Sequence, residues 1–118
     1  MSLLGGEALP VIRLETPRTF YDYEAKYADG AGTEYLCPCG LAPAAEARLQ
    51  ALASAAFDAV GGAGWGRVDL LCDGDGEPWL IDVNTAPGMT GHSLVPMAAR
   101  AAGLSFEDLV WRILETSL

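Results

Sequence analysis

The 118-residue chain has 16 acidic and 7 basic side chains and a formal net charge of −9. Nucleic acid is not an expected partner, because phosphate contacts need a basic surface and the Lys and Arg residues do not cluster. No apolar run approaches the roughly 20 residues of a membrane span, and the first residues do not resemble a signal peptide. We therefore expect a cytoplasmic protein with no membrane partner and one domain large enough to bury a core.

The first half of the chain is predicted to contain two strands, a loop and a helix. Residues 9–15 are expected to form a strand, and the polar stretch 20–33 a long loop of the kind that is usually functional or disordered. Residues 34–37 are expected to form a second, short strand. Pro43 then starts a helix that Gly61 ends. The apolar stripe expected on this helix comprises Leu49, Leu52, Ala56, Phe57 and Val60.

Two further helices are predicted near the end of the chain. The first runs over about residues 94–102 and ends at Gly103. Ser105 and Asp108 resemble a capping box at the start of the second. Its expected apolar stripe comprises Phe106, Leu109, Val110, Ile113 and Leu114. With a β-hairpin between the two halves, the order of elements predicts an α+β fold, a mainly antiparallel sheet with flanking helices.

The hairpin is predicted from two strand-like segments on either side of Asp73-Gly74-Asp75-Gly76. Asp-Gly favours a type I′ turn, which needs positive φ at both central residues. A turn at Asp75-Gly76 places Asp69 opposite Asp82 and Arg67 opposite Asn84, whereas a turn at Gly74-Asp75 shifts the pairing by two residues. Either pairing leaves these four side chains on one face. The other face is expected to be core, formed by Val68, Leu70, Cys72, Trp79, Ile81 and Val83.

The polar face of this hairpin is a candidate metal site. Two carboxylates directly across a ladder repel each other, so the arrangement calls for a cation or a protonated partner. The oxygen ligands Asp69, Asp82 and Asn84 suit Mg²⁺, which usually takes one or two carboxylates and completes its shell with water and phosphates. The alternative is an ordinary solvated strand face.

The three cysteines do not fit the pattern of a usual four-ligand zinc site, since the chain has a single histidine. Their odd number fits reduced thiols. Cys37 and Cys39 are expected to have a structural role at the end of a strand.

Five motifs follow one another along the chain: Tyr21-Asp-Tyr-Glu-Ala-Lys26-Tyr27, Cys37-Pro38, Gly64-Trp-Gly-Arg67-Val-Asp69, Asp82-Val-Asn-Thr-Ala-Pro-Gly-Met-Thr90 and His92-Ser-Leu-Val-Pro-Met-Ala98. Together they resemble the C-terminal part of the D-alanine–D-alanine ligases, which are ATP-grasp enzymes. The resemblance extends over about residues 9–114. It implies that residues 1–118 form the C-terminal ATP-grasp catalytic subdomain, without the N-terminal and central domains.

The resemblance implies an activity for the parent protein. Such a ligase transfers the γ-phosphoryl group of ATP to the carboxylate of one D-alanine, and the amine of a second D-alanine attacks the acyl-phosphate to form the dipeptide for peptidoglycan. Asp69, Asp82 and Asn84 match ligands of two Mg²⁺ ions, with Mn²⁺ as an alternative metal. The parent protein is expected to be a homodimer, and this part alone is expected to be inactive.

The resemblance also implies roles for three catalytic residues. Arg67 matches an arginine at the γ-phosphate and the tetrahedral intermediate; its alternative role is an ion pair with Asp82. Gly88 resembles a glycine whose backbone N–H contributes to an oxyanion hole, and its alternative is an ordinary turn glycine. Ser93 matches a serine that binds the carboxylate of the second D-alanine, and its alternative is a helix N-cap.

The remaining implied roles concern binding. Leu94, with Ser93, positions the second D-alanine, and Tyr27 of the Lys26-Tyr27 pair favours amide over ester formation. The implied nucleotide-binding residues are Phe20, Lys26, Ile81 and Asp82. The chain departs from the family at Asp82, where most members have Glu, and at Gly91, where Ser is frequent. Two other interpretations stay open: another ATP-grasp carboxylate–amine ligase, and a non-catalytic truncated protein.

Overall fold

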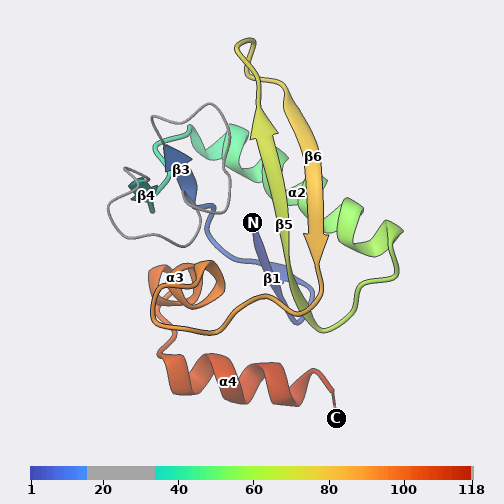
Figure 1. Cartoon of the computed structure of the whole chain (residues 1–118), viewed down its shortest axis with the longest axis vertical. Helices are drawn as coiled ribbons and strands as arrows, with labels where there is room; N and C mark the ends of the chain where they lie inside the picture. Colours follow the sequence, from blue (N-terminus) through green and yellow to red (C-terminus); the bar gives the residue numbers. More distant parts are fainter. Residues whose placement is uncertain (16–33, 118) are drawn as a thin grey trace.

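The computed structural model describes residues 1–15 and 34–117 of the chain. The expected loop, with Phe20, Lys26 and Tyr27, lies outside the described residues. The described part contains a four-stranded antiparallel sheet, a separate two-stranded sheet and three helices (Figure 1). None of these helices is both long enough and apolar enough to cross a membrane. The predicted α+β class is confirmed.

The larger sheet has the strand order β2-β1-β5-β6. Its members are β1 (Ser2–Leu4), β2 (Glu7–Ala8), β5 (Trp65–Cys72) and β6 (Pro78–Asn84). The turn between β1 and β2 consists of Gly5 and Gly6, which have φ angles of 59° and 85°. Glycine adopts this left-handed backbone without a steric penalty, which permits the tight reversal.

Two apolar clusters lie on opposite faces of β1. Leu3 packs with Ala53 and Phe57 of α2 (Pro43–Ala59) and with Val68 of β5. Leu4 packs with residues of α3 (Leu94–Ala101) and α4 (Phe106–Glu115) in a cluster that includes Val95, Ala98, Ala99 and Leu109. Because successive side chains of a strand point to opposite faces, α2 covers one face of the sheet and α3 and α4 pack on the other.

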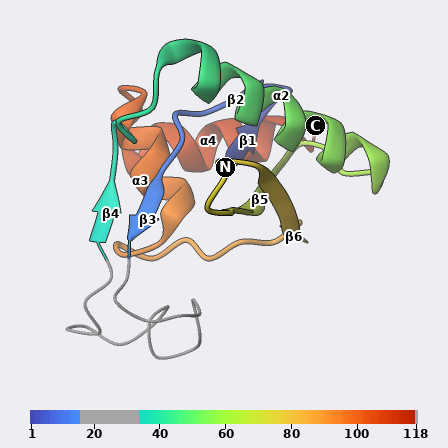
Figure 2. The ribbon, with the colours of Figure 1, turned by 90° about the horizontal axis from the view of Figure 1, so that it is seen from above.

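The strand predicted over residues 9–15 is shorter than expected. Only β3 (Arg13–Glu15) is regular, and it pairs with β4 (Glu34–Leu36) in the separate sheet, seen beside α3 in Figure 2. Before β3, the Leu9 N–H donates to the Ser2 carbonyl of β1 at 2.8 Å, and the next backbone groups bond to α2. The Val11 N–H donates to Glu46 Oε1 at 3.0 Å, and Gln50 Nε2 donates to the Leu9 carbonyl at 3.1 Å. Pro10, which has no N–H, cannot extend a ladder there.

The predicted helices are confirmed near their expected limits. α2 has proline at its first turn, and Gly61 follows its end with φ 77°. α4 begins with the capping box: the Asp108 N–H donates to Ser105 Oγ at 3.1 Å, and the Ser105 N–H donates to Asp108 Oδ2 at 3.5 Å. These end signals are local in sequence, which is why they could be read without the fold.

The predicted apolar stripes of these helices are only partly correct. Leu52 of α2 and Val60 at its C-cap are exposed, while Ala53 and Phe57 are buried against the sheet. In α4, Leu109 is buried and Ile113 packs beside it. The other members of its stripe, Phe106, Val110 and Leu114, are exposed. Each helix therefore buries a narrower line of residues than its sequence pattern predicted.

The hairpin has the predicted pairing at the candidate site. Arg67 lies opposite Asn84, and Asp69 lies opposite Asp82. The register then shifts by one residue, so that Leu70 pairs with Leu80 and Ile81 is the extra residue of a β-bulge. Bulges of this kind increase strand twist and often occur beside functional sites.

The hairpin turn is not the predicted type I′. The Gly76 N–H donates to the Asp73 carbonyl at 3.0 Å, so Gly74 and Asp75 are the central residues. Neither has a positive φ, whereas Gly76 has φ 79°. A turn followed by a left-handed glycine is the usual three-residue hairpin connection, which ends in a glycine bulge. The Asp-Gly signal located the hairpin but not its turn type.

The face of the hairpin that was predicted to be core is buried only near β1. Val68 is buried, and Leu70 and Val83 pack against the same cluster. The other predicted members, Cys72, Trp79 and Ile81, are exposed. After the bulge, Trp79 pairs with Leu71 and so shares the face of Arg67 and Asp69, opposite to the prediction.

Candidate functional site

A buried arginine is the central feature of the polar face. Arg67 is 6% exposed. Its Nε donates to Asp69 Oδ1 at 2.8 Å and its Nη2 donates to Asp69 Oδ2 at 3.1 Å, so two parallel bonds hold the planar guanidinium. The alternative ion pair with Asp82 is not formed, because Arg67 pairs along its own strand.

The Arg67–Asp69 pair leaves part of the guanidinium available. A guanidinium has five N–H groups, and the two bonds to Asp69 use two of them. Within the described residues, no buried side-chain nitrogen or oxygen lacks a partner. The Nη1 group of Arg67, which has no bond to the described residues, must therefore reach the surface. Asp69 therefore holds one edge of the guanidinium, and the other edge is available to bind a ligand.

The metal-ligand candidates lie together on this face. Asp69 is half-buried and Asp82 is exposed, and the two are direct cross-strand partners. Asn84 Oδ1 accepts a hydrogen bond from the Ala86 N–H at 3.0 Å, which fixes the side chain and still leaves a lone pair.

The donor set fits a magnesium ion that also binds a phosphate. Among the residues that the structure describes, no group of three or more His, Cys, Asp or Glu side chains could hold a metal. Two carboxylates and an amide oxygen are nevertheless sufficient for Mg²⁺, because it commonly takes its remaining ligands from water and phosphates. Both oxygens of Asp69 keep lone pairs beyond those used by Arg67.

Met1 lies beside this face. The Val68 N–H donates to the Met1 carbonyl at 2.7 Å, so the first residue lies along β5.

A second cluster lies in the segment between β6 and α3. Ser93 Oγ accepts a hydrogen bond from the Thr90 N–H at 2.9 Å and lies 2.8 Å from Thr90 Oγ1. The His92 N–H donates to Thr90 Oγ1 at 3.3 Å. A Cβ atom on Gly88 would lie 3.0 Å from Ser93 Oγ, so Gly88 and Ser93 are close neighbours.

Ser93 does not cap α3 with its side chain, although capping was its alternative role. Ser93 occupies the N-cap position of α3, but its side chain makes no capping hydrogen bond. Leu94, the first residue of α3, packs against the cluster around Leu4. Thr90 was not singled out from the sequence, although a threonine three residues before a serine allows such a contact between their hydroxyls.

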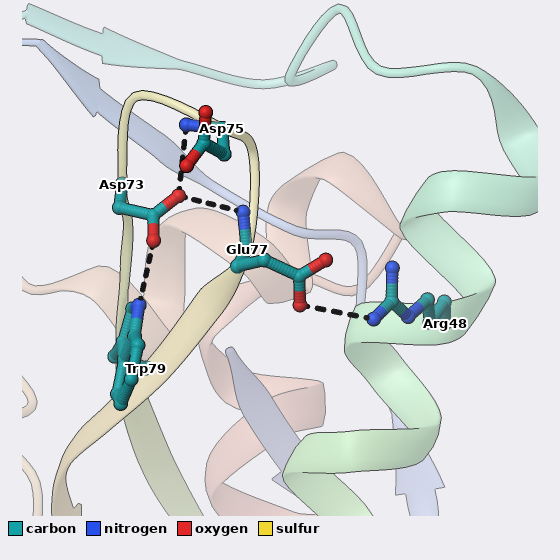
Figure 3. A network of polar contacts seen from close by, with 5 residues as sticks. All are labelled: Arg48, Asp73, Asp75, Glu77 and Trp79. Atoms are coloured by element: carbon teal, nitrogen blue, oxygen red, sulfur yellow. Dashed lines mark hydrogen bonds and ion pairs between the residues drawn. The ribbon is translucent and has the colours of Figure 1, made fainter.

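The tip of the hairpin is held by a third polar network, which sequence reasoning also missed. Asp73 Oδ1 accepts hydrogen bonds from the N–H groups of Asp75 and Glu77, both at 2.9 Å, and Asp73 Oδ2 accepts one from Trp79 Nε1 at 2.9 Å (Figure 3). Glu77 also forms an ion pair with Arg48 of α2 at 3.5 Å. An aspartate directly before a turn was the available signal.

The structure thus groups the predicted residues into two clusters. Strand register brings together Arg67, Asp69, Asp82 and Asn84, and the short segment after β6 holds Gly88 and Ser93. Ile81 is exposed in the bulge next to Asp82. A cavity of about 230 Å³ lies elsewhere, between the β1–β2 turn and α4, and none of the predicted residues lines it.

Comparison with known proteins identifies close relatives over almost the whole chain. A family model described as D-ala D-ala ligase C-terminus matches residues 1–115. A curated D-alanine–D-alanine ligase from Methylococcus capsulatus is 64% identical over 115 residues, which cover 98% of this chain and 37% of the relative. The chain therefore spans only about 37% of the length of this curated relative.

Solved structures give the same result. The D-alanine–D-alanine ligase from Bacillus anthracis matches with a TM-score of 0.81 and 37% identity, over 98% of this chain and 37% of that chain. A structure of that ligase complexed with ATP gives a TM-score of 0.78 and 32% identity, over 98% and 36% of the two chains. VanG D-Ala:D-Ser ligase from Enterococcus faecalis gives 0.76 and 30%, over 99% and 35%.

Proposed function

The chain belongs to the D-ala D-ala ligase C-terminus family, and from this premise we propose that it supplies the metal-binding and acyl-transfer part of an ATP-dependent D-alanine–D-alanine ligase. The observation that carries the proposal is the polar face of the hairpin, where the clamped Arg67 lies beside Asp69, Asp82 and Asn84. Phosphoryl transfer concentrates negative charge, and catalysis of it consists mainly of positioning and charge stabilisation.

Asp69, Asp82 and Asn84 would hold Mg²⁺, or Mn²⁺ in its place. When bound, the metal neutralises phosphate charge and orients the transferred group. Asp69 has a second task, because its two oxygens hold Arg67 in place. The free edge of Arg67 then donates hydrogen bonds to oxygens that gain charge during transfer.

The segment after β6 serves the second half of the reaction. The γ-phosphoryl group of ATP moves to the carboxylate of the first D-alanine, and ADP leaves. The amine of the second D-alanine attacks the acyl carbon, and phosphate leaves as the amide bond forms. The Gly88 N–H donates to the oxyanion of the tetrahedral intermediate, and Ser93 with Leu94 binds the carboxylate of the second D-alanine.

The roles of the remaining residues rest on the resemblance alone. Phe20 and Lys26 bind the nucleotide, together with Ile81 and Asp82 on the hairpin, and Tyr27 contributes to substrate binding and favours amide formation. The structure of the Bacillus anthracis ligase complexed with ATP supports ATP as the nucleotide. The full-length protein is a cytoplasmic homodimer in this proposal.

A chimeric enzyme tests the proposed function. The 115 residues of the Methylococcus capsulatus relative that match this chain are replaced by the matching residues of this chain, and the product is called the ligase chimera. We expect ATP-dependent phosphate release that requires D-alanine and Mg²⁺, with the dipeptide as product. A folded chimera that releases no phosphate with D-alanine would contradict the proposal.

The same assay distinguishes the alternatives. VanG D-Ala:D-Ser ligase is similar in structure to this chain but is named for D-serine as the second amino acid. Each second amino acid, D-serine included, is therefore offered in competition with D-alanine. Preference for another amine would favour a different ATP-grasp ligase, and loss of all activity in a well-folded chimera would favour a non-catalytic protein.

A further inference from the structure

The Ser93 hydroxyl is held by one residue through two contacts. The backbone N–H of Thr90 donates to Ser93 Oγ at 2.9 Å, and Thr90 Oγ1 lies 2.8 Å from the same atom. Ser93 makes no bond to the first turn of α3, where a serine at the N-cap usually bonds. Its side chain is therefore turned away from the helix and toward Thr90.

Either hydroxyl can be the donor in the contact between Thr90 Oγ1 and Ser93 Oγ, and a carboxylate that accepts the Ser93 proton selects the direction in which Thr90 donates. Each hydroxyl has one proton and two lone pairs. Thr90 Oγ1 already accepts a hydrogen bond from the His92 N–H at 3.3 Å, and its own proton can go to Ser93 Oγ. Ser93 Oγ then accepts two hydrogen bonds, one from each donor of Thr90. The proton of Ser93 becomes its one unused hydrogen-bonding group.

We propose that Thr90 is a positioning residue that makes the Ser93 hydroxyl a hydrogen-bond donor to the carboxylate of the second amino acid. The inference rests on the proposed function, because it assumes that Ser93 binds this carboxylate. A carboxylate accepts hydrogen bonds and cannot donate them when ionised. Thr90 O–H then donates to Ser93 Oγ, and Ser93 O–H donates to the carboxylate. Hydrogen bonds that follow one another in this way strengthen each other.

Gly88 lies close to the Ser93 side chain that contacts Thr90. A Cβ atom at position 88 would lie 3.0 Å from Ser93 Oγ, which is closer than most such contacts. A glycine at this position therefore leaves Ser93 free to remain in the rotamer that meets Thr90. The neighbouring Gly91 has open space around the position of a Cβ atom, so its substitution is a matched control within the same segment.

A double-mutant cycle in the ligase chimera tests the inference. The variants are Thr90→Val, Thr90→Ser, Ser93→Ala and the combination of Thr90→Val with Ser93→Ala, and Gly91→Ala is the control. We expect Thr90→Val to raise KM for the second D-alanine roughly three- to tenfold, the range for one neutral hydrogen bond. Ser93→Ala should raise it by about tenfold or more, because that bond reaches a charged group.

Three further measurements separate positioning from general damage. Thr90→Ser should restore KM, because it keeps the hydroxyl. In the Ser93→Ala background, Thr90→Val should change KM no further, because Thr90 acts through Ser93. The KM for ATP, the melting temperature and all parameters of Gly91→Ala should stay near those of the unsubstituted chimera.

The outcomes that overturn the inference differ from those that overturn the proposed function. If Ser93→Ala raises KM and Thr90→Val does not, Thr90 has no positioning role. The same conclusion follows if Thr90→Val has its full effect without Ser93. A folded but inactive chimera, or an active one with an unchanged KM in Ser93→Ala, overturns the assignment of Ser93 and this role with it.

Discussion

The buried guanidinium of Arg67 shows how one residue combines a structural and a functional task. Asp69 compensates its charge through two hydrogen bonds along the strand. An unpaired buried charge is strongly destabilising, so Asp69 stabilises Arg67 in its buried position. The edge of Arg67 that remains free is suited to bind oxyanions.

Arg67→Ala in the ligase chimera is expected to lower kcat by roughly 10²–10³, the effect of removing one oxyanion donor. Arg67→Lys should recover little, because an ammonium group cannot reproduce the planar fork. Steady-state kinetics with both variants checks this, with melting temperatures measured in parallel. Near-normal kcat in the lysine variant would show that Arg67 acts only as a partner of Asp69.

Asp82→Asn tests metal binding more specifically than a substitution of Asp69 does. Asp69→Asn weakens the pair with Arg67 as well, so its effect combines stability and catalysis. Asp82 has no such partner within the described part of the chain. We expect Asp82→Asn to reduce phosphoryl transfer severely and to be partly relieved by high Mg²⁺, because one ligand charge is lost. A Mg²⁺ titration of phosphate release measures this; unchanged turnover would exclude Asp82 as a ligand.

The pKa of Asp73 at the hairpin tip is expected to lie below the ordinary value of an aspartate. The hydrogen bond from Trp79, followed by those from the Glu77 and Asp75 N–H groups, lowers the pKa of Asp73 below 3.8. Because the folded pKa is the lower one, the stabilisation is complete above 3.8 and is lost as the pH falls through the folded value. Trp79→Phe should return the pKa toward 3.8, which an NMR titration of the carboxyl carbon checks. An equal pKa in both proteins would contradict the network.

At the scale of elements, the β5–β6 hairpin depends on its contact with α2. Phe57 of α2 packs against β5 where Gly66 has no side chain: a Cβ atom there would lie 2.5 Å from the Phe57 ring and 3.0 Å from the Asn84 carbonyl. The backbone of the hairpin therefore approaches the helix as closely as a glycine allows. This contact sets the distance between the helix and the strand that carries Arg67 and Asp69.

Gly66→Ala is expected to destabilise the ligase chimera by about 1–3 kcal/mol, the usual cost of overpacking. Gly74→Ala is the matched control, because its Cβ atom would meet no neighbour and its φ is not positive. We expect the control to change stability by no more than about 0.5 kcal/mol. Thermal or denaturant unfolding of both variants measures the difference. Equal stabilities would show that Phe57 can move aside.

At the scale of the whole molecule, the proposed active site is partly open to solvent. The polar face of the hairpin is open to solvent at Asp82, and a run of apolar side chains beside it is exposed: Leu71, Trp79, Leu80 and Ile81. The relatives that bear the ligase name are much longer, since the chain spans only 37% of the first of them. Electrostatic catalysis needs a site from which water is excluded.

We therefore expect the 118-residue chain by itself to show no ligase activity and to bind Mg-ATP weakly. Calorimetric titration of the chain with Mg-ATP, beside the same titration of the ligase chimera, measures the difference. Nanomolar or low-micromolar binding by the isolated chain would contradict this prediction. Such a result would mean that the hairpin and its neighbours form a nucleotide site without further protein.

The amino-acid sequence by itself determined the features that depend on near neighbours in the chain. The helix ends at Gly61 and Ser105, the α+β order of elements and the position of the hairpin follow from capping, turn and periodicity signals. The family motifs supplied the candidate residues and their roles. The pairing of Asp69 with Asp82 was also among the predicted registers, because a hairpin turn limits the register of its strands.

Only the tertiary structure decided which apolar residues are buried and which partners the polar ones have. Trp79 and Ile81 were placed in the core because alternation was assumed to continue, but a one-residue bulge reverses the faces beyond it. Arg67 bonds to Asp69, and Ser93 bonds to Thr90 instead of capping α3, because several partners lie within reach of each side chain. Packing around the chain selects among them, and that selection depends on contacts between residues far apart in sequence.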